Sequence, residues 1–143
     1  MIRAADVMHV SSAAIRFNGI SADAKLDSWA DVMAHKNELV LELRQAKYAD
    51  LLPQYKTIRY VEGMAKLVSG GVDVDGKYYK SNKIIITTGS HSHLPLIEGI
   101  QNVPYLDSTS ALELPELPKS MIVIGAGGIG CELGQMFARM GTK

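Results

Sequence analysis

The stretch that decides the fold is Met121-Ile-Val-Ile-Gly-Ala-Gly-Gly-Ile-Gly-Cys-Glu-Leu-Gly-Gln-Met-Phe-Ala-Arg-Met-Gly141. It begins with an apolar run that favours a strand, and it continues into a G-x-G-x-x-G pattern at Gly125, Gly127 and Gly130. Apolar residues then recur at helical spacing, at Ile129, Leu133, Met136, Phe137 and Met140. Gly141 is a typical residue to follow the end of such a helix. The sequence therefore predicts a strand, a tight glycine turn and a helix in direct succession.

Each glycine of this pattern has a physical role in binding a dinucleotide. Gly125 permits the tight turn, Gly127 lets the main chain approach a pyrophosphate, and Gly130 allows the helix and strand to pack closely. The free N–H groups and the dipole at the start of the helix favour the phosphate charge. The acidic residue that separates NAD from NADP is expected about 20 positions further on, beyond Lys143, so both cofactors stay open. A glycine-rich turn without a ligand is the alternative.

The composition of the 143-residue chain is that of an ordinary globular protein. Apolar residues make up 47% of it, enough to bury a core, and 15 basic residues balance 15 acidic ones. A balanced charge offers no field that attracts nucleic acid or anionic lipid. No apolar run reaches the roughly 18 residues that a membrane helix needs, and Arg3 and Asp6 interrupt any apolar leader. We therefore expect a soluble, cytoplasmic protein without nucleic-acid or membrane partners.

Few side chains outside the glycine pattern suggest chemistry. Cys131 is the only cysteine, which excludes a disulfide or redox dithiol within this chain, and we interpret it as a small packing residue. Glu132 is interpreted as a solvated carboxylate favoured by the helix start. His91 and His93 flank Ser92 without a carboxylate or thiol beside them, and they are interpreted as solvated loop residues. The sequence therefore predicts no catalytic residue and no metal ligand.

Two helices are expected before residue 53. The first residues of the chain already have helical spacing, without an N-cap ahead of them. A long helix is predicted over residues 28–52, with Ser28 as its N-cap, Asp31 in a capping-box position and Pro53 just beyond its end. Its apolar stripe favours packing against the parent domain over binding a separate partner.

Beyond Tyr55 the apolar period changes from helical to alternating. Short strands are predicted near residues 58–61 and 65–68, followed by a hairpin over residues 72–79 with Asp75-Gly76 as its turn. The β-branched run at residues 84–90 predicts a strand buried on both faces of a parallel sheet. Residues 91–118 contain four prolines and are the candidate linker between two units.

Both ends of the chain resemble cut ends, because neither carries a polar tail or a stop signal. A helix is expected from the first residues, and the last residues lie where a second strand would begin. We therefore expect an internal piece of a longer protein. A complete small domain with frayed ends is the alternative.

Two stretches of the sequence resemble the FAD-dependent pyridine nucleotide-disulfide oxidoreductases. They are Ile84-Ile-Ile-Thr-Thr-Gly-Ser90 and Ile122-Val-Ile-Gly-Ala-Gly-Gly-Ile-Gly-Cys-Glu132, and the segment Tyr105-Leu-Asp-Ser-Thr-Ser-Ala-Leu-Glu113 between them is also similar. In this family the first stretch closes the nucleotide-binding part of the FAD domain, and the second binds the nicotinamide nucleotide. Within the family, residues 42–48 and 111–119 resemble the mercuric reductases, with the dihydrolipoamide dehydrogenases as near relatives.

The resemblance implies two sets of cofactor-binding residues. Ala65 matches a position whose backbone meets the FAD adenine, and Thr88, Gly89 and Ser90 match a loop close to the flavin nucleotide. The NAD(P)H-binding set is Gly125, Ala126, Gly127, Gly128, Ile129, Gly130 and Glu132. The chain departs from the family at Thr87, where alanine is usual, and at Gly128, where a bulky residue, often tyrosine, is common.

The resemblance also implies the architecture and the activity. The fold class would be α/β, a partial Rossmann-like two-domain flavoprotein with a β-meander and a long helix. Residues 1–93 would end the FAD domain, and residues 94–143 would hold the linker and first β-α unit of the NAD(P)-binding domain. The parent enzyme, a homodimer, would pass electrons from NADPH through FAD and a cysteine pair to Hg(II). This piece alone is expected to be inactive, because it lacks the cysteine pair, the first FAD glycine pattern and the dimerisation domain. A non-catalytic nucleotide-binding module is the alternative from another class.

Overall fold

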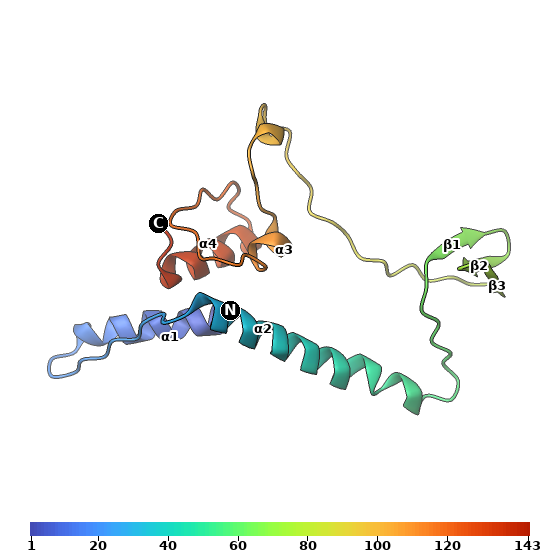
Figure 1. Cartoon of the computed structure of the whole chain (residues 1–143), viewed down its shortest axis with the longest axis horizontal. Coiled ribbons are helices and arrows are strands. Elements are labelled where there is room, and N and C mark those ends of the chain that lie inside the picture. Colours follow the sequence, from blue (N-terminus) through green and yellow to red (C-terminus); the bar gives the residue numbers. More distant parts are fainter. The chain divides into compact units, whose positions relative to one another are not determined.

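The computed structural model describes residues 1–143, which form two compact units. One unit comprises Met1–Val40 with Ser92–Lys143, and the other comprises Leu41–His91. The elements follow one another along the chain as Figure 1 shows. They are α1 (Ile2–Ser12), α2 (Trp29–Arg44), β1 (Ala65–Val68), β2 (Gly71–Val74), β3 (Lys77–Lys80), α3 (Ser108–Ala111) and α4 (Gly128–Met140).

The core of the first unit forms where α4 packs against α1 and the start of α2. Phe137 is 1% exposed, and its ring centroid lies 6.0 Å from that of Trp29. The Trp29 indole N–H donates a hydrogen bond to the Leu114 carbonyl at 2.8 Å, so the ring buries its apolar surface while its polar atom is satisfied. The other buried apolar residues are Ala5, Met33, Ala111, Met136 and Met140.

The C-terminal end of α4 is closed by a Schellman motif. Gly141 adopts the left-handed conformation, its N–H donates to the Ala138 carbonyl, and the Thr142 N–H donates to the Phe137 carbonyl at 3.0 Å. This confirms Gly141 as the residue that ends the helix. Close by in the sequence, Arg139 forms an ion pair with Asp6, which ties α4 to α1.

The two predicted N-terminal helices are confirmed, with one difference in length. The Ser28 hydroxyl accepts a hydrogen bond from the Asp31 N–H at 3.1 Å, as expected of an N-cap. However, α2 ends at Arg44, and a π-helical turn, Gln45–Ala49, follows it. The Asp50 N–H donates to the Gln45 carbonyl, and the Gln45 side chain donates to the Asp50 carboxylate at 2.6 Å. These local bonds explain why the helix does not continue to residue 52.

The second unit contains a three-stranded antiparallel meander with the order β1-β2-β3. Val74 pairs with Lys77, so Asp75 and Gly76 form the predicted two-residue turn. Both turn residues have positive φ, at 49° and 84°, which is the geometry of a type I′ turn. The strands predicted at residues 65–68 and in the hairpin are therefore confirmed, whereas residues 58–61 form no strand.

The two longest β-branched runs are extended apolar segments rather than paired strands. The predictions of a buried strand at residues 84–90 and of a strand at residues 121–124 are wrong for this structure, because no other part of the chain forms a ladder with either segment. Their composition indicates which residues suit a sheet, but a strand also needs a hydrogen-bonding neighbour. A single parallel contact is present, since the Lys143 N–H donates to the Lys119 carbonyl and the Met121 N–H donates to the Lys143 carbonyl. The segment after α4 therefore returns parallel to the segment before it, as in a β-α-β unit.

A short helix, α3, begins with a capping box that the sequence reasoning missed. The Asp107 carboxylate accepts hydrogen bonds from the N–H groups of Thr109 and Ser110, and the Ser110 hydroxyl accepts one from the Asp107 N–H at 2.9 Å. The Ser110 N–H, with its hydroxyl, lowers the pKa of Asp107 below its ordinary value because both bonds favour the ionised carboxylate.

Phe137→Ala should destabilise the first unit by about 3–5 kcal/mol, because it removes the aromatic centre of the core. The matched control is Phe17→Ala, since the chain has 2 phenylalanines and Phe17 is 62% exposed. Urea denaturation followed by Trp29 fluorescence measures both changes. Equal midpoints for the two variants would contradict the assignment of the core.

The Asp107 cap should make stability depend on pH in the acid range. Because the pKa of Asp107 is lowered in the folded state, the contribution of its carboxylate to folding stability is fully present above the pKa of the unfolded state, about 3.9. It is lost as the pH falls through the lower folded pKa. Asp107→Asn keeps an acceptor but does not ionise, so its urea midpoint should fall less between neutral and acidic pH. Parallel pH profiles for the two proteins would refute this role.

Candidate functional site

The glycine pattern forms an exposed loop that leads directly into α4. Gly125 has a φ of +108°, a backbone conformation that residues with a Cβ rarely adopt, and the loop turns there. A Cβ added at Gly125, Gly127 or Gly128 would meet no heavy atom within 4 Å. The space beside these three residues is therefore open to a ligand.

Gly130 occupies the opposite kind of environment. A Cβ added there would lie 2.6 Å from the Gly125 carbonyl oxygen, so only glycine permits this approach of helix and loop. One turn later, a Cβ on Gly134 would lie 3.3 Å from a methyl group of Val123. Gly130 and Gly134 thus form one smooth face of α4 against the segment that precedes the loop. The role of Gly130 confirms the prediction from its spacing. Gly134 was missed, although its position four residues later is the signal that could have found it.

The N-terminus of α4 offers unpaired main-chain donors. Gly127 is the N-cap and has no side-chain cap, and the first helical hydrogen bond runs from the Cys131 N–H to the Gly127 carbonyl at 3.0 Å. The N–H groups of Gly128, Ile129 and Gly130 therefore have no partner within the helix. Gly128 and Ile129 are exposed, and free N–H groups at a helix start, with the positive end of the helix dipole, fit a phosphate or pyrophosphate. The geometry of the glycine loop therefore fits a phosphate group.

Two further side chains belong to the start of α4. Cys131 is exposed and its thiol donates to the Ala126 carbonyl at 3.5 Å, so the prediction of a packing role is wrong. The reason is its place on the helix, because the buried positions of α4 are Met136, Phe137 and Met140. Glu132 is exposed, as predicted for a solvated carboxylate.

The residues proposed for FAD lie in the other unit, on and after the meander. Ala65 is the first residue of β1 and pairs with Val74, and it is exposed. Just before it, the Met64 N–H donates to the Asp75 carboxylate at 3.1 Å, and a Cβ on Gly63 would lie 2.3 Å from that carboxylate. The hairpin turn thus fixes the backbone that enters β1.

The loop of Thr88, Gly89 and Ser90 is also exposed. Each of the two cofactor-binding sets therefore lies within one unit. The residues of the NAD(P)H set lie within the single stretch 125–132, and those of the FAD set come from β1 and from the segment after β3. The assignment of both sets to cofactors stays a prediction, as does the domain boundary at residues 93 and 94.

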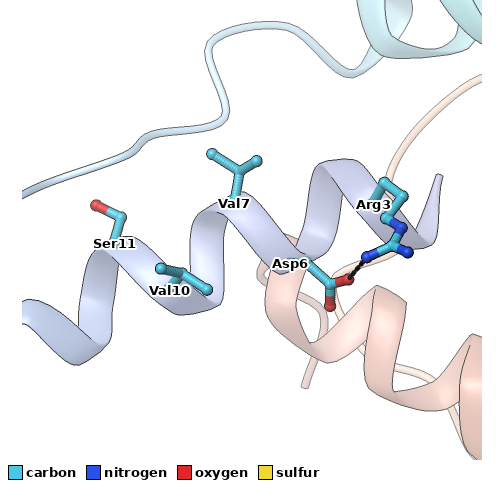
Figure 2. A pocket seen from close by; sticks show the side chains of 5 residues that line it. All are labelled: Arg3, Asp6, Val7, Val10 and Ser11. Atoms are coloured by element: carbon cyan, nitrogen blue, oxygen red, sulfur yellow. Dashed lines mark ion pairs between the residues drawn. The ribbon is translucent and has the colours of Figure 1, made fainter.

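A separate, open hollow of about 560 Å³ runs along α1. Figure 2 shows the side chains that line it, including Arg3 and Asp6, whose charged atoms lie 3.9 Å apart. Val7, Val10 and Ser11 complete the lining. Two of its five lining residues are aliphatic and two others form an ion pair with each other, and no glycine turn borders it, so it does not resemble a dinucleotide site.

The structure also bears on metal ions and membranes as possible partners. The structure contains no group of three or more His, Cys, Asp or Glu residues that could hold a metal ion. None of its helices has both the length and the apolar character needed to span a membrane. His91 and His93 are exposed, as predicted.

Comparison with known proteins shows the family to which the chain belongs. Residues 6–143 match the family described as pyridine nucleotide-disulphide oxidoreductase, and the chain belongs to this family. The family assignment also confirms the predicted fold class, a partial α/β Rossmann-like structure.

Several mercuric reductases are among the proteins similar to this chain. The chain is 38% identical over 144 residues to the mercuric reductase of Lysinibacillus sphaericus, covering 100% of this chain and 26% of that protein. It is 34% identical to the mercuric reductase of Streptomyces lividans, covering 100% of this chain and 31% of the relative. Dihydrolipoyl dehydrogenase 3 of Pseudomonas aeruginosa is 35% identical over 132 residues, which cover 87% of this chain and 27% of that enzyme. The chain thus spans about a quarter of the length of these relatives.

Three alanine substitutions test the packing of the loop on α4. Gly130→Ala should destabilise the first unit by about 1–3 kcal/mol, because the new Cβ meets main chain that cannot move aside easily. Gly134→Ala should reduce the stability of the unit by less than Gly130→Ala does, since the Val123 side chain can shift by a few tenths of an ångström. Gly128→Ala should be neutral or stabilising by up to about 1 kcal/mol, because its space is open.

Urea denaturation of the three variants measures this order directly. Gly128→Ala is the matched control, since it makes the same chemical change within the same loop. An equal loss of stability in Gly128→Ala and Gly130→Ala would contradict the close approach at Gly130.

Proposed function

We propose that this chain supplies nucleotide-binding parts of an FAD-dependent NAD(P)H oxidoreductase of the mercuric reductase type. The observation that carries the proposal is the uncapped start of α4, where three main-chain N–H groups have no partner within the helix and the space beside Gly127 and Gly128 is open. The chain's membership of the family supports the oxidoreductase class. The names of its relatives support Hg(II) as the substrate.

The N–H groups of Gly128, Ile129 and Gly130 would bind the pyrophosphate of NAD(P)H. Gly127 would leave the space into which the phosphates fit, and Gly125 would turn the chain so that no side chain covers the amides. Ala126 would border the phosphates, and Glu132 would lie one turn into the helix, on the nicotinamide nucleotide. The role of these residues is to bind and orient, and none of them reacts.

Ala65 and the loop of Thr88, Gly89 and Ser90 would contact FAD through main chain and small side chains. When bound, NADPH would supply a hydride, and FAD would relay the two electrons by way of a cysteine pair to Hg(II). The cysteine pair would come from outside residues 1–143, since Cys131 is the only cysteine here. We further propose that the enzyme acts in the cytoplasm as a homodimer.

Two other functions remain as alternatives. A dihydrolipoyl dehydrogenase would use FAD and a nicotinamide nucleotide to oxidise a dihydrolipoyl dithiol to its disulfide, and one relative carries that name. A nucleotide-binding module without catalysis would use the same α4 loop alone.

Gly127→Val tests the loop within the chain itself. The new side chain would fill the space beside the amides without straining the fold, because Gly127 has a φ of −73°. The affinity for NADPH, measured by titration calorimetry, should fall by about tenfold or more if phosphate contacts at the helix start are blocked. Gln135→Val, on the exposed side of α4, is the matched control and should bind as the original chain does. Equal affinities for the two variants would refute the loop as the site.

A domain exchange tests the substrate. This chain would replace the matching 144-residue segment in the Lysinibacillus sphaericus mercuric reductase, and separately the matching 132-residue segment in Pseudomonas aeruginosa dihydrolipoyl dehydrogenase 3. FAD content, read from flavin absorbance, reports whether each chimera assembles. We expect the first chimera to retain flavin and NADPH-dependent Hg(II) reduction and the second to lose flavin. Retention of flavin and activity in the second alone would favour a dihydrolipoyl dehydrogenase.

A further inference from the structure

Thr142 is the only polar residue buried in this structure, with 7% of its surface exposed. Its N–H donates to the Phe137 carbonyl at 3.0 Å, so its main chain is fixed to the end of α4. Its hydroxyl donates a hydrogen bond to the Pro118 carbonyl at 2.9 Å, which satisfies a polar group that is costly to bury alone. Thr142 therefore joins the end of α4 to the entry segment, residues 118–124, which leads into the glycine loop.

The entry segment runs back along α4, from the C-terminal end of the helix to its N-terminal end. Near the start of the segment, the Lys119 carbonyl accepts a hydrogen bond from the Lys143 N–H at 3.1 Å, and the Met121 N–H donates to the Lys143 carbonyl at 2.9 Å. Beyond its end, the Gly125 carbonyl oxygen lies against Gly130 in the first turn of α4. Hydrogen bonds therefore hold one end of the segment, and a close contact with the helix limits the other.

Packing alone does not fix how far the entry segment lies along α4. The helix presents Gly130 and Gly134 to the segment, so it offers no side chain at these two positions to interlock with it. A hollow of about 70 Å³ remains there, bordered by Val123, Gly134 and Thr142. Apolar contact is non-directional, whereas a hydrogen bond has a definite distance and direction. The position of the segment along the helix therefore depends on the hydrogen bonds of Thr142 and Lys143.

We propose that Thr142 is a positioning residue for the glycine loop. Of the three hydrogen bonds that hold the start of the entry segment, only that of the Thr142 hydroxyl comes from a side chain. The Gly125 carbonyl lies only 2.6 Å from the place of a Cβ at residue 130, so a small slide of the segment disturbs this contact. The hydroxyl thus sets where the loop lies beside the free N–H groups of α4. The consequence for NAD(P)H binding rests on the proposed function.

Substitutions at Thr142 separate the role of its hydroxyl from that of its bulk. Thr142→Val keeps the shape and removes the hydroxyl, Thr142→Ser keeps the hydroxyl and removes a methyl group, and Thr142→Ala removes both. In ¹H–¹⁵N spectra of the labelled chain without ligand, we expect the first and third variants to shift the amide resonances of residues 125–130. Thr142→Ser should leave these resonances in place.

The matched control for the spectra is Met33→Ala. It weakens the same core from α2 and should leave the resonances of residues 125–130 unchanged. Unmoved resonances in both Thr142→Val and Thr142→Ala would overturn the proposal. Equal movements in Thr142→Ser or in Met33→Ala would overturn it too, because they would assign the effect to packing or to general loss of stability.

Titration calorimetry with NADPH tests the consequence for binding. We expect the dissociation constant to rise about fivefold in Thr142→Val, because a loop that is in place for only part of the time binds more weakly in proportion. Thr142→Ser should restore the affinity, and Met33→Ala should bind as the original chain does although its urea midpoint falls. Equal affinities of Thr142→Val and the original chain would overturn the proposal. An original chain that binds no NADPH would refute the proposed function instead, and the spectra without ligand would still decide the role of Thr142.

Discussion

The contact between Gly130 and the Gly125 carbonyl is the constraint on which the rest of the first unit depends. With 2.6 Å between that oxygen and the place of a Cβ, the helix can start where it does only if residue 130 has no side chain. The same approach sets Gly134 against Val123 and turns Met136, Phe137 and Met140 toward α1 and α2. This close packing fixes the loop against the start of α4, where main-chain N–H groups have no partner within the helix.

The sequence predicts the features that depend on local chemistry. Ser28 caps α2, Gly141 ends α4, and Asp75-Gly76 forms the hairpin turn because each of these residues suits one local backbone geometry. The glycine spacing similarly predicts which residue packs and which faces open space. These parts of the fold follow from contacts within a few residues.

The features that the sequence did not predict depend on distant partners or on competing local bonds. Residues 84–90 have the composition of a buried strand, but composition does not supply the neighbour that a ladder requires. The end of α2 at Arg44 depends on bonds between Gln45 and Asp50, which favour a π-helical turn over one more α-helical turn. Cys131 is exposed because of its angular position on α4, which a count of apolar residues did not resolve. The cofactor contacts proposed for Ala65 and for residues 88–90 rest on the family resemblance, because their own geometry shows exposed backbone without a phosphate-binding feature.

The proposed binding of the NAD(P)H pyrophosphate by main-chain N–H groups at the start of α4 can be observed at those groups themselves. The most direct measurement is a two-dimensional ¹H–¹⁵N spectrum of the labelled chain during titration with NADPH. We expect the amide resonances of Gly128, Ile129 and Gly130 to move furthest, because hydrogen bonds to an anion change the shielding of those protons. Saturating shifts confined to other residues, or unchanged resonances for these three at millimolar NADPH, would contradict it.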